Sequence, residues 1–335
     1  MMNKTKIYFI ENSFDYNGLD LNSENIGGSE KTLINITNEL AADKRFTIKV
    51  FNNTTKPDLI NKVTWTNINQ INGEDKPDYV IAMSDANLFK KLNSSKNFLW
   101  SHSIQSLEKF IRKKQLIPFM KFKPIMILEG DYHYNKRSFL TSIFGKKILK
   151  IAPDYDFINT KVDLNYIPPP NAIFTTKSDR NLEILLSSWH EIKKKNKESK
   201  LFINPPYNLN DLQKKDDVYL RLKGNKKSLI NELKESKLFI TPGHKTEVFC
   251  LAAEEARELC IPIVTMGYGC LYERVIHEET GFIAKNIEEF VYYSNLVLSN
   301  NEIFTNLRKN LFKRRNARNY SHVKNDLIKL LKVND

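Results

Sequence analysis

The sequence has no apolar run that approaches the roughly 20 residues needed to cross a bilayer. Its N-terminal stretch turns polar again at Glu11, which is too early for the apolar region of a secretory signal. Both absences predict a cytoplasmic protein. Cysteine is also scarce: Cys250, Cys260 and Cys270 are spaced ten apart, which fits neither a disulfide framework nor the close ligand pairs of a zinc site. We therefore expect reduced thiols.

Acidic residues are outnumbered, with 39 Asp and Glu against 52 Lys and Arg and a formal net charge of +13. Such an excess attracts nucleic acid, anionic lipid or phosphorylated substrates, and charge alone does not distinguish them. The excess is uneven: residues 104–150 contain 11 basic and 3 acidic residues, and residues 305–335 contain 9 and 2. A length of 335 residues with 41% apolar residues excludes disorder as the main state and favours two domains.

Short β-branched and aromatic runs alternate with segments of helical periodicity, which predicts βαβ units around parallel sheets. The expected strands are residues 6–10, 47–51, 79–83, 98–100, 124–128, 148–152, 173–176, 201–204, 238–241 and 261–266. The expected helices are residues 180–193, 228–235, 249–259 and 287–298, together with one that Ser29 caps and basic helices toward the C-terminus.

Three consecutive prolines at 168–170 cannot continue a helix or a central strand, so we place the domain boundary there. The expected domains are residues 1–168 and 169–320, followed by a helix at 321–335. Both domains are expected to be Rossmann-like, with parallel sheets that face each other across a cleft. Ligands of such sheets bind beyond the carboxyl ends of the strands, so we expect the function in that cleft.

The most informative segment is 241–256, which predicts a strand, a Pro-Gly turn, Glu247 at the start of a helix and Glu255 inside it. The first amides of that helix would bind a phosphate; they belong to Phe249, Cys250 and Leu251. A carboxylate repels phosphate, so we expect Glu247 to face sugar hydroxyls. Along a helix the two acids would be about 12 Å apart, beyond the roughly 5–9.5 Å of hydrolytic pairs. Glycoside hydrolysis by this pair is therefore disfavoured.

These motifs resemble the nucleotide-sugar glycosyltransferases of the GT-B fold, in particular glycosyltransferase family 4 (glycosyl transferases group 1). Glu247 and Glu255 have the Glu-x7-Glu spacing of that family. Further segments match in the order of the family, and they are Gly27-Gly28-Ser29-Glu30, Phe98–His102, Ser178–Trp189, Met266-Gly-Tyr-Gly269, Glu273-Arg-Val and Glu279–Ala284.

The resemblance implies retaining transfer of a sugar, of the hexosyltransferase type, from a nucleotide-diphosphate sugar to an acceptor hydroxyl. It implies that Arg180 binds the diphosphate, Glu247 the transferred sugar and Glu255 the donor ribose. His102 would lie near the anomeric end of the sugar, and the Gly27-Gly28 loop would approach donor or acceptor. No metal or other cofactor would be required, because the nucleotide sugar is a co-substrate.

The donor would bind mainly to the C-terminal domain, and a glycan or lipid-linked acceptor to the N-terminal one, to which the last helix crosses back in similar proteins. Cell-surface glycan or lipopolysaccharide-type biosynthesis is the expected setting. Cys250 and Cys260 stand where many members carry glycine, which predicts a negative φ at both positions. Lys177, Lys245 or neither supplies the second cation for the diphosphate. His133, His244 and the cysteines are expected to be structural.

Residues 106–123 interleave basic and apolar side chains. They predict either docking on the anionic inner face of a membrane or a solvated helix and loop. Three alternatives to transfer remain: a nucleotide-sugar epimerase of related fold, a basic nucleic-acid-binding protein and an inactive carbohydrate-binding relative. The basic runs lack an ordered nucleic-acid recognition motif, so we expect no nucleic-acid partner.

Overall fold

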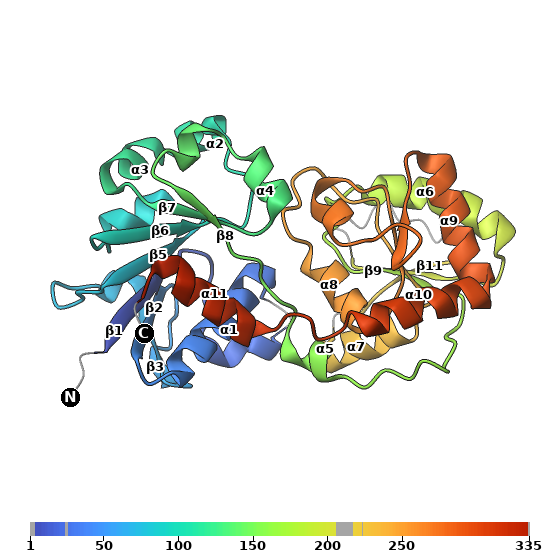
Figure 1. Ribbon diagram of the computed structural model, residues 1–335, viewed down its shortest axis with the longest axis horizontal. Helices are drawn as coiled ribbons and strands as arrows, with labels where there is room; N and C mark the ends of the chain where they lie inside the picture. The colour runs from blue at the N-terminus through green and yellow to red at the C-terminus, as the bar shows by residue number, and fades with distance from the viewer. Residues whose placement is uncertain (1–3, 24–25, 206–216, 223, 334–335) are drawn as a thin grey trace. The chain divides into compact units, whose positions relative to one another are not determined.

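The computed structural model describes residues 4–23, 26–205, 217–222 and 224–333 (Figure 1). The chain divides into two compact units. Unit 1 comprises Met1–Ala152 together with Tyr320–Asp335, and unit 2 comprises Pro153–Asn319. Each unit is an α/β fold built on its own sheet.

The sheet of unit 1 has the strand order β3-β4-β2-β1-β5-β6-β7-β8 among the described residues. Of these strands β3 alone is antiparallel to its neighbour. The strands are β1 (Thr5–Ile10), β2 (Phe46–Asn52), β3 (Asp58–Ile60), β4 (Val63–Asn67), β5 (Tyr79–Met83), β6 (Lys96–Trp100), β7 (Ile125–Leu128) and β8 (Lys146–Ile148). Every residue of β5 is buried, because helices cover both faces of a parallel sheet at its centre.

The helices of unit 1 are α1 (Gly28–Ala42), α2 (Leu107–Arg112), α3 (Leu116–Phe122), α4 (Asp131–Lys136) and α11 (Tyr320–Leu331). Its 3₁₀ helices are η1 (Gly18–Asn22), η2 (Ile68–Gln70), η3 (Ala86–Lys90) and η4 (Leu140–Ser142). Gly27, not Ser29, is the N-cap of α1, and the Ser29 hydroxyl donates to Glu30 instead (2.9 Å). The C-terminal helix α11 packs against α1 (Figure 1), where the Tyr320 hydroxyl contacts Thr32 Oγ1 at 3.3 Å.

Unit 2 has an all-parallel sheet with the order β11-β10-β9-β12-β13-β14. Its strands are β9 (Ala172–Phe174), β10 (Leu201–Ile203), β11 (Val218–Leu220), β12 (Leu238–Ile240), β13 (Ile263–Thr265) and β14 (Gly281–Ile283). Its helices are α5 (Tyr155–Asn159), α6 (Leu182–Lys195), α7 (Lys226–Lys234), α8 (Leu251–Glu258), α9 (Ile287–Ser299), α10 (Asn301–Lys313) and the 3₁₀ helix η6 (Gly269–Glu273). Leu185, Trp189 and Ile192 of α6 are fully buried, as the apolar spacing of that segment predicts.

The boundary between the units lies between Ala152 and Pro153, upstream of the predicted position at 168/169. The connecting segment belongs to unit 2, because arginines of that unit bind its carbonyl groups. Arg308 donates to the carbonyls of Tyr166 and Asp163, and Arg315 donates to those of Ile158 and Thr160. The prolines interrupt regular structure inside unit 2 and do not separate the units.

Four strands were missed by the sequence-based expectation, namely β3, β4, β11 and β14. β3, β11 and β14 have three residues each, and β14 begins with a glycine, so their apolar signal is weak. The predicted strand 148–152 is β8, which lies earlier at Lys146–Ile148, because two lysines in an edge strand give no apolar pattern. Among the described residues no helix combines the length and the apolar character that membrane crossing requires.

Candidate functional site

The strand order of unit 2 reverses between β9 and β12, which is where parallel sheets of this kind bind ligands. The loop after β9 carries Lys177 and Arg180, and the loop after β12 carries Lys245 and Glu247. Adjacent parallel strands end at the same sheet edge, so these two loops lie side by side. The Asn181 amide confirms this by donating to the Gly243 carbonyl at 2.6 Å.

Arg180 lies in the turn before α6, which begins two residues later than predicted. Its guanidinium contacts His244 Nδ1 at 3.2 Å and donates to the Thr246 hydroxyl, and Asp179 lies 3.5 Å away. The Thr246 amide also donates to His244 Nδ1, so that nitrogen is an acceptor. His244 was expected to be structural; it supports Arg180 from the neighbouring loop.

Glu247 is a partly buried carboxylate whose Oε2 has no hydrogen-bond partner among the described residues. Burial raises the pKa of Glu247, while a hydrogen bond from the Cys250 thiol and the charge of Arg180 oppose that rise. A buried acceptor without a partner costs about 1–3 kcal/mol. Such an atom is suited to accept a hydrogen bond from a ligand hydroxyl.

The backbone around Glu247 depends on glycines in the left-handed region. Gly243 has φ +83°, and Gly269 has φ +71°. A Cβ at Gly269 would lie 2.3 Å from the His244 carbonyl oxygen and 2.8 Å from that of Glu247. The Cys270 amide donates to the Glu247 carbonyl at 3.1 Å, which links the same two segments. The loop that holds Glu247 therefore packs backbone against backbone on the loop after β13.

Helix α8 begins at Leu251, two residues after the predicted start at Phe249. Of the three predicted phosphate-binding amides, Leu251 alone lies in the helix, and those of Phe249 and Cys250 precede it. The expectation of a negative φ at the two cysteines is wrong. Cys250 has φ +60° and Cys260 has φ +57°, so the chain keeps a backbone that glycine adopts more easily and accepts the strain of a side chain.

Arg274 belongs to the matching segment Glu273-Arg-Val but was given no role from the sequence; in the structure it fixes the segment before α8. Its guanidinium lies over the Phe249 ring at 4.1 Å, donates to the Phe249 carbonyl at 2.8 Å and pairs with buried Glu254 at 3.2 Å. Burial opposes the charge of Arg274, but Glu254 together with Glu273 and the nearby thiols outweighs it and raises the pKa of Arg274. Glu255, the neighbour of Glu254 in α8, is partly exposed. Because Glu247 precedes the helix, the helical estimate of its distance from Glu255 does not apply.

Lys177 and Lys245 are both exposed, one on each of the two loops. The Lys177 carbonyl accepts from the Arg180 amide at 3.0 Å, which shapes the turn. The identity of a second cation for a diphosphate stays a prediction.

In unit 1 the predicted His102 lies two residues after β6, at the carboxyl edge of the sheet. Its Nδ1 is 2.5 Å from Oε1 of Glu129, which directly follows β7. Burial disfavours the cation, but Glu129, with Glu30 and Glu11, outweighs it and raises the pKa of His102. Sequence reasoning missed Glu129, because the partner of His102 comes from the next strand of the sheet and not from a nearby position.

The Gly27-Gly28 loop leads into α1, where Glu30 lies in the first turn. Glu11 follows β1, at the position where the strand order of this sheet reverses. Burial is the main cause that raises the pKa of Glu11 to about 7, and the charge of Glu30 adds to it. The glycine loop therefore borders a group of carboxylates in unit 1.

The prediction that no metal is needed took no account of Asp154-Tyr155-Asp156, an Asp-x-Asp triplet. Both aspartates contact Lys226 Nζ, at 2.7 and 3.0 Å, and Asp154 caps α5. These contacts give the triplet a structural role. Among the described residues no group of three or more His, Cys, Asp or Glu side chains is arranged to hold a metal ion. Metal independence stays a prediction.

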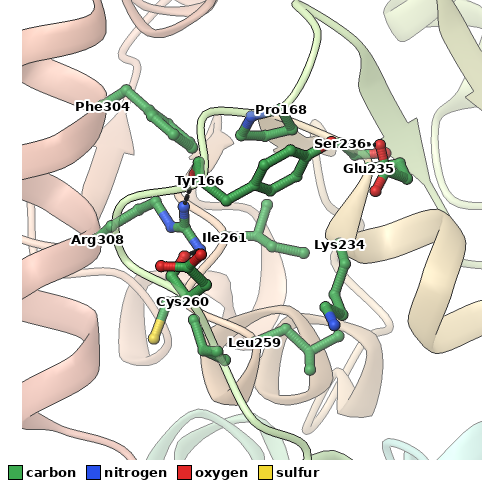
Figure 2. A pocket seen from close by; sticks show the side chains of 12 residues that line it. Tyr166, Pro168, Lys234, Glu235, Ser236, Leu259, Cys260, Ile261, Phe304 and Arg308 are labelled. Carbon is green, nitrogen blue, oxygen red and sulfur yellow. Dashed lines mark hydrogen bonds between the residues drawn. The ribbon is translucent and has the colours of Figure 1, made fainter.

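A pocket of about 260 Å³ lies elsewhere in unit 2 (Figure 2). Ser236 and Ile261 on its wall precede β12 and β13, so it faces the amino edge of the sheet, opposite to Glu247. The Tyr166 hydroxyl donates to the Glu235 carboxylate at 2.6 Å. Arg308 donates to the Tyr166 and Asp163 carbonyls of the connecting segment. The polar groups of this pocket therefore attach residues 153–170 to unit 2.

A family model described as glycosyl transferases group 1 matches residues 175–314, which contain Arg180, Glu247 and Glu255. Solved structures share the fold at low sequence identity. Sucrose-phosphate synthase from Thermosynechococcus elongatus has a TM-score of 0.74 and 14% identity over 98% of each chain. WaaG, a glycosyltransferase involved in lipopolysaccharide biosynthesis, has a TM-score of 0.70 and 10% identity over 98% of this chain and 100% of its own.

HepE from Anabaena, in complex with UDP-glucose, has a TM-score of 0.70 and 14% identity over 98% of this chain and 99% of its own. These similarities show the fold class, the GT-B architecture with two parallel-sheet, Rossmann-like units. The search of curated proteins found no match for the sequence.

Proposed function

We propose that this chain is a retaining glycosyltransferase of the family 4 type that transfers a sugar from a nucleotide-diphosphate sugar to an acceptor hydroxyl. One observation carries the proposal. Arg180, Glu247 and the start of α8 converge where the strand order of unit 2 reverses, inside the residues that the glycosyl transferases group 1 model matches. UDP-sugars are the first donors to test, because HepE is in complex with UDP-glucose.

The proposed roles follow from charge. Negative charge develops on the leaving diphosphate, where the Arg180 guanidinium and the amides at the α8 N-terminus would stabilise it. The unpartnered Glu247 Oε2 would accept from a sugar hydroxyl. Glu255 would bind the ribose, and Lys177 or Lys245 is the candidate for a second diphosphate contact. Transfer would need neither a metal ion nor a resident cofactor.

Unit 1 would contribute His102 at the anomeric end of the sugar and the Gly27-Gly28 loop beside donor or acceptor. The acceptor would be a glycan or a lipid-linked molecule in cell-surface or lipopolysaccharide-type biosynthesis. The anomeric configuration of the product, measured by NMR of the isolated glycoside, tests retention. Turnover of the donor without any acceptor would instead favour the epimerase.

Donor binding gives the sharpest test. A thermal-shift screen with uridine, guanosine, adenosine and cytidine diphosphate sugars identifies the base, because a ligand that binds the folded form raises its melting temperature. We expect Arg180→Ala and Glu255→Ala each to weaken binding of that donor at least tenfold in calorimetry. Arg314→Ala removes an exposed guanidinium of the same unit and is the matched control. Unchanged donor affinity in the first two variants would refute the proposed roles.

We further propose that unit 1 docks on an anionic membrane surface through residues 106–123. Phe110 and Phe119, two of the apolar residues in this segment, are buried in the core of unit 1 and cannot contact a membrane. The exposed apolar residues are Ile111, Ile117 and Met120, and the exposed cations of the same segment are Arg112, Lys113, Lys114, Lys121 and Lys123. Each cation near an anionic surface contributes about 1 kcal/mol.

Cosedimentation with phosphatidylglycerol vesicles tests this docking. We expect binding to vesicles that contain phosphatidylglycerol, weaker binding at high salt and loss of binding in Ile117→Ser combined with Lys113→Glu. Ile287→Ser, an exposed isoleucine of unit 2, is the control and should bind as the wild type does. Binding that is absent, or that is insensitive to salt, would exclude the membrane surface.

A further inference from the structure

His102 and Glu129 form a pair at the carboxyl edge of the unit 1 sheet. They follow the adjacent strands β6 and β7, and Nδ1 of the histidine is 2.5 Å from Oε1 of the glutamate. The Glu129 side chain is 3% exposed, and that of His102 is 13% exposed. A carboxylate buried to this degree needs a charged partner, and His102 lies at ion-pairing distance from it.

The orientation of the pair is fixed from several sides. The Glu129 amide donates to His133 Nδ1 at 3.2 Å, so the proton of His133 lies on Nε2, which donates to the Ser103 carbonyl at 3.0 Å. Burial lowers the pKa of His133 to about 4, so this linking histidine is neutral. The His102 amide donates to the Ser84 hydroxyl at 3.2 Å. Both loops are thus held together independently of the pair.

The second ring nitrogen of His102 is buried, and it has no hydrogen-bond partner among the described residues. Since Nδ1 faces a carboxylate, Nδ1 carries a proton. The state of Nε2 then decides the chemistry: a neutral ring offers a base there, and an imidazolium offers a donor.

The charges around His102 favour the imidazolium. Three carboxylates face it from separate elements: Glu129 after β7, Glu30 in α1 and Glu11 after β1. His133 in α4 is neutral, and Lys109 of α2 is directed at the Ser103 hydroxyl at 2.5 Å. Burial alone would favour the neutral ring, but these carboxylates outweigh it and raise the pKa of His102.

We propose that Glu129 is a positioning residue that keeps His102 as an imidazolium, whose Nε2–H donates to an oxygen of the bound activated sugar. His102 then acts as a hydrogen-bond donor and not as a general base. The identity of the acceptor oxygen rests on the proposed function, whereas the charge and orientation of His102 do not. Glu129 touches no substrate in this scheme and acts through the ring.

NMR titration of the histidine ring signals tests the pair without any substrate. His102→Gln identifies the His102 signal among the six histidines. We expect a His102 pKa above 6.5 in the wild type and, in Glu129→Gln, a fall that corresponds to at least a tenfold weaker proton affinity. Glu30→Gln should give a smaller fall. Asp131→Asn removes an exposed carboxylate two residues after Glu129 and should leave the His102 pKa unchanged.

A second readout is the pH dependence of donor binding. Wild-type affinity should fall as the pH rises through the His102 pKa, and in Glu129→Gln the fall should occur at lower pH. A wild-type His102 pKa at or below 6.5, or one unchanged in Glu129→Gln, would overturn the inference. If Glu129→Gln does not fold, the His102 pKa of the wild type alone tests the inference. If the titrations agree but no nucleotide sugar binds, the proposed function fails and the assignment of Glu129 stands.

Discussion

In unit 2 the loops after β12 and β13 pack backbone against backbone around one buried carboxylate, Glu247, whereas in unit 1 the loops after β1, β6 and β7 carry several buried ionisable side chains that interact. Gly243 and Gly269 adopt left-handed conformations beside Glu247. In unit 1, His102 and Glu129 face each other, and Glu11 lies among further carboxylates. The loops at the carboxyl edge of the sheet are thus held by close backbone packing in unit 2 and by interactions between ionisable side chains in unit 1.

This difference predicts different sensitivities. A site made by backbone packing fails when an atom is added. A site made by buried carboxylates and a histidine tolerates isosteric changes, but its stability depends on protonation. Substitutions in each unit can therefore test the comparison directly.

The largest effect is expected for Gly269→Ala in unit 2. At φ +71° the new Cβ would lie 2.3 Å from the His244 carbonyl oxygen, and backbone atoms cannot yield cheaply. We expect a loss of about 3 kcal/mol or more of unfolding free energy, together with the loss of donor binding. Urea unfolding measures the first and calorimetry the second.

Gly73→Ala in unit 1 is the control, because no atom lies within 4 Å of the position of its Cβ. Its stability should change by less than about 0.5 kcal/mol. Equal stability of Gly269→Ala and the wild type would show that the loop after β12 does not depend on close backbone packing.

The next effect concerns the carboxylates of unit 1. The pKa of Glu11 is raised to about 7, so between pH 4.5 and 7 the folded chain binds more protons than the unfolded chain does. The wild type is therefore stabilised by this group below pH 4.5, and it loses that stability as the pH rises through 7. In Glu11→Gln this loss is absent, so relative to the wild type it should gain roughly 2–3 kcal/mol between pH 4.5 and 8.

Urea unfolding at several pH values measures this gain. Glu74→Gln changes an exposed carboxylate of the same unit and should follow the wild type at every pH. A gain equal in the two variants would mean that Glu11 is solvated in the folded chain, and unit 1 would then lack the charge-based site that distinguishes it.

The two sites also differ in how far the sequence predicts them. Arg180, Glu247 and Glu255 lie in short segments whose spacing can be read in the linear sequence, so the candidate site of unit 2 could be proposed from the sequence, and the roles of these residues stay predictions. Glu11, Glu30 and Glu129 belong to separate segments, and only the strand order brings them near His102. Parallel sheets were predictable from apolar periodicity, while short edge strands such as β11 and β14 were not.

Backbone conformation was the weakest part of the sequence-based view. A cysteine at position 250 predicted an ordinary φ, because side chains rarely adopt the left-handed region. The contacts of Arg274 with the Phe249 carbonyl and ring hold the preceding residue in place. Arg274 lies more than twenty positions from Phe249, and the resemblance of its segment to the glycosyltransferases does not show which carbonyl or ring its guanidinium contacts.

The smallest effect, of about 1 kcal/mol, tests that conformation. Both Cys250→Ala and Cys250→Gly remove the buried thiol, but only glycine relieves the strain at φ +60°. We expect Cys250→Gly to be the more stable of the two by about 1 kcal/mol in urea unfolding. At Ala252, inside α8, glycine should instead be less stable than alanine by a similar amount. If alanine were preferred at both positions, residue 250 would have an ordinary helical backbone, and unit 2 would not owe its site to strained loops.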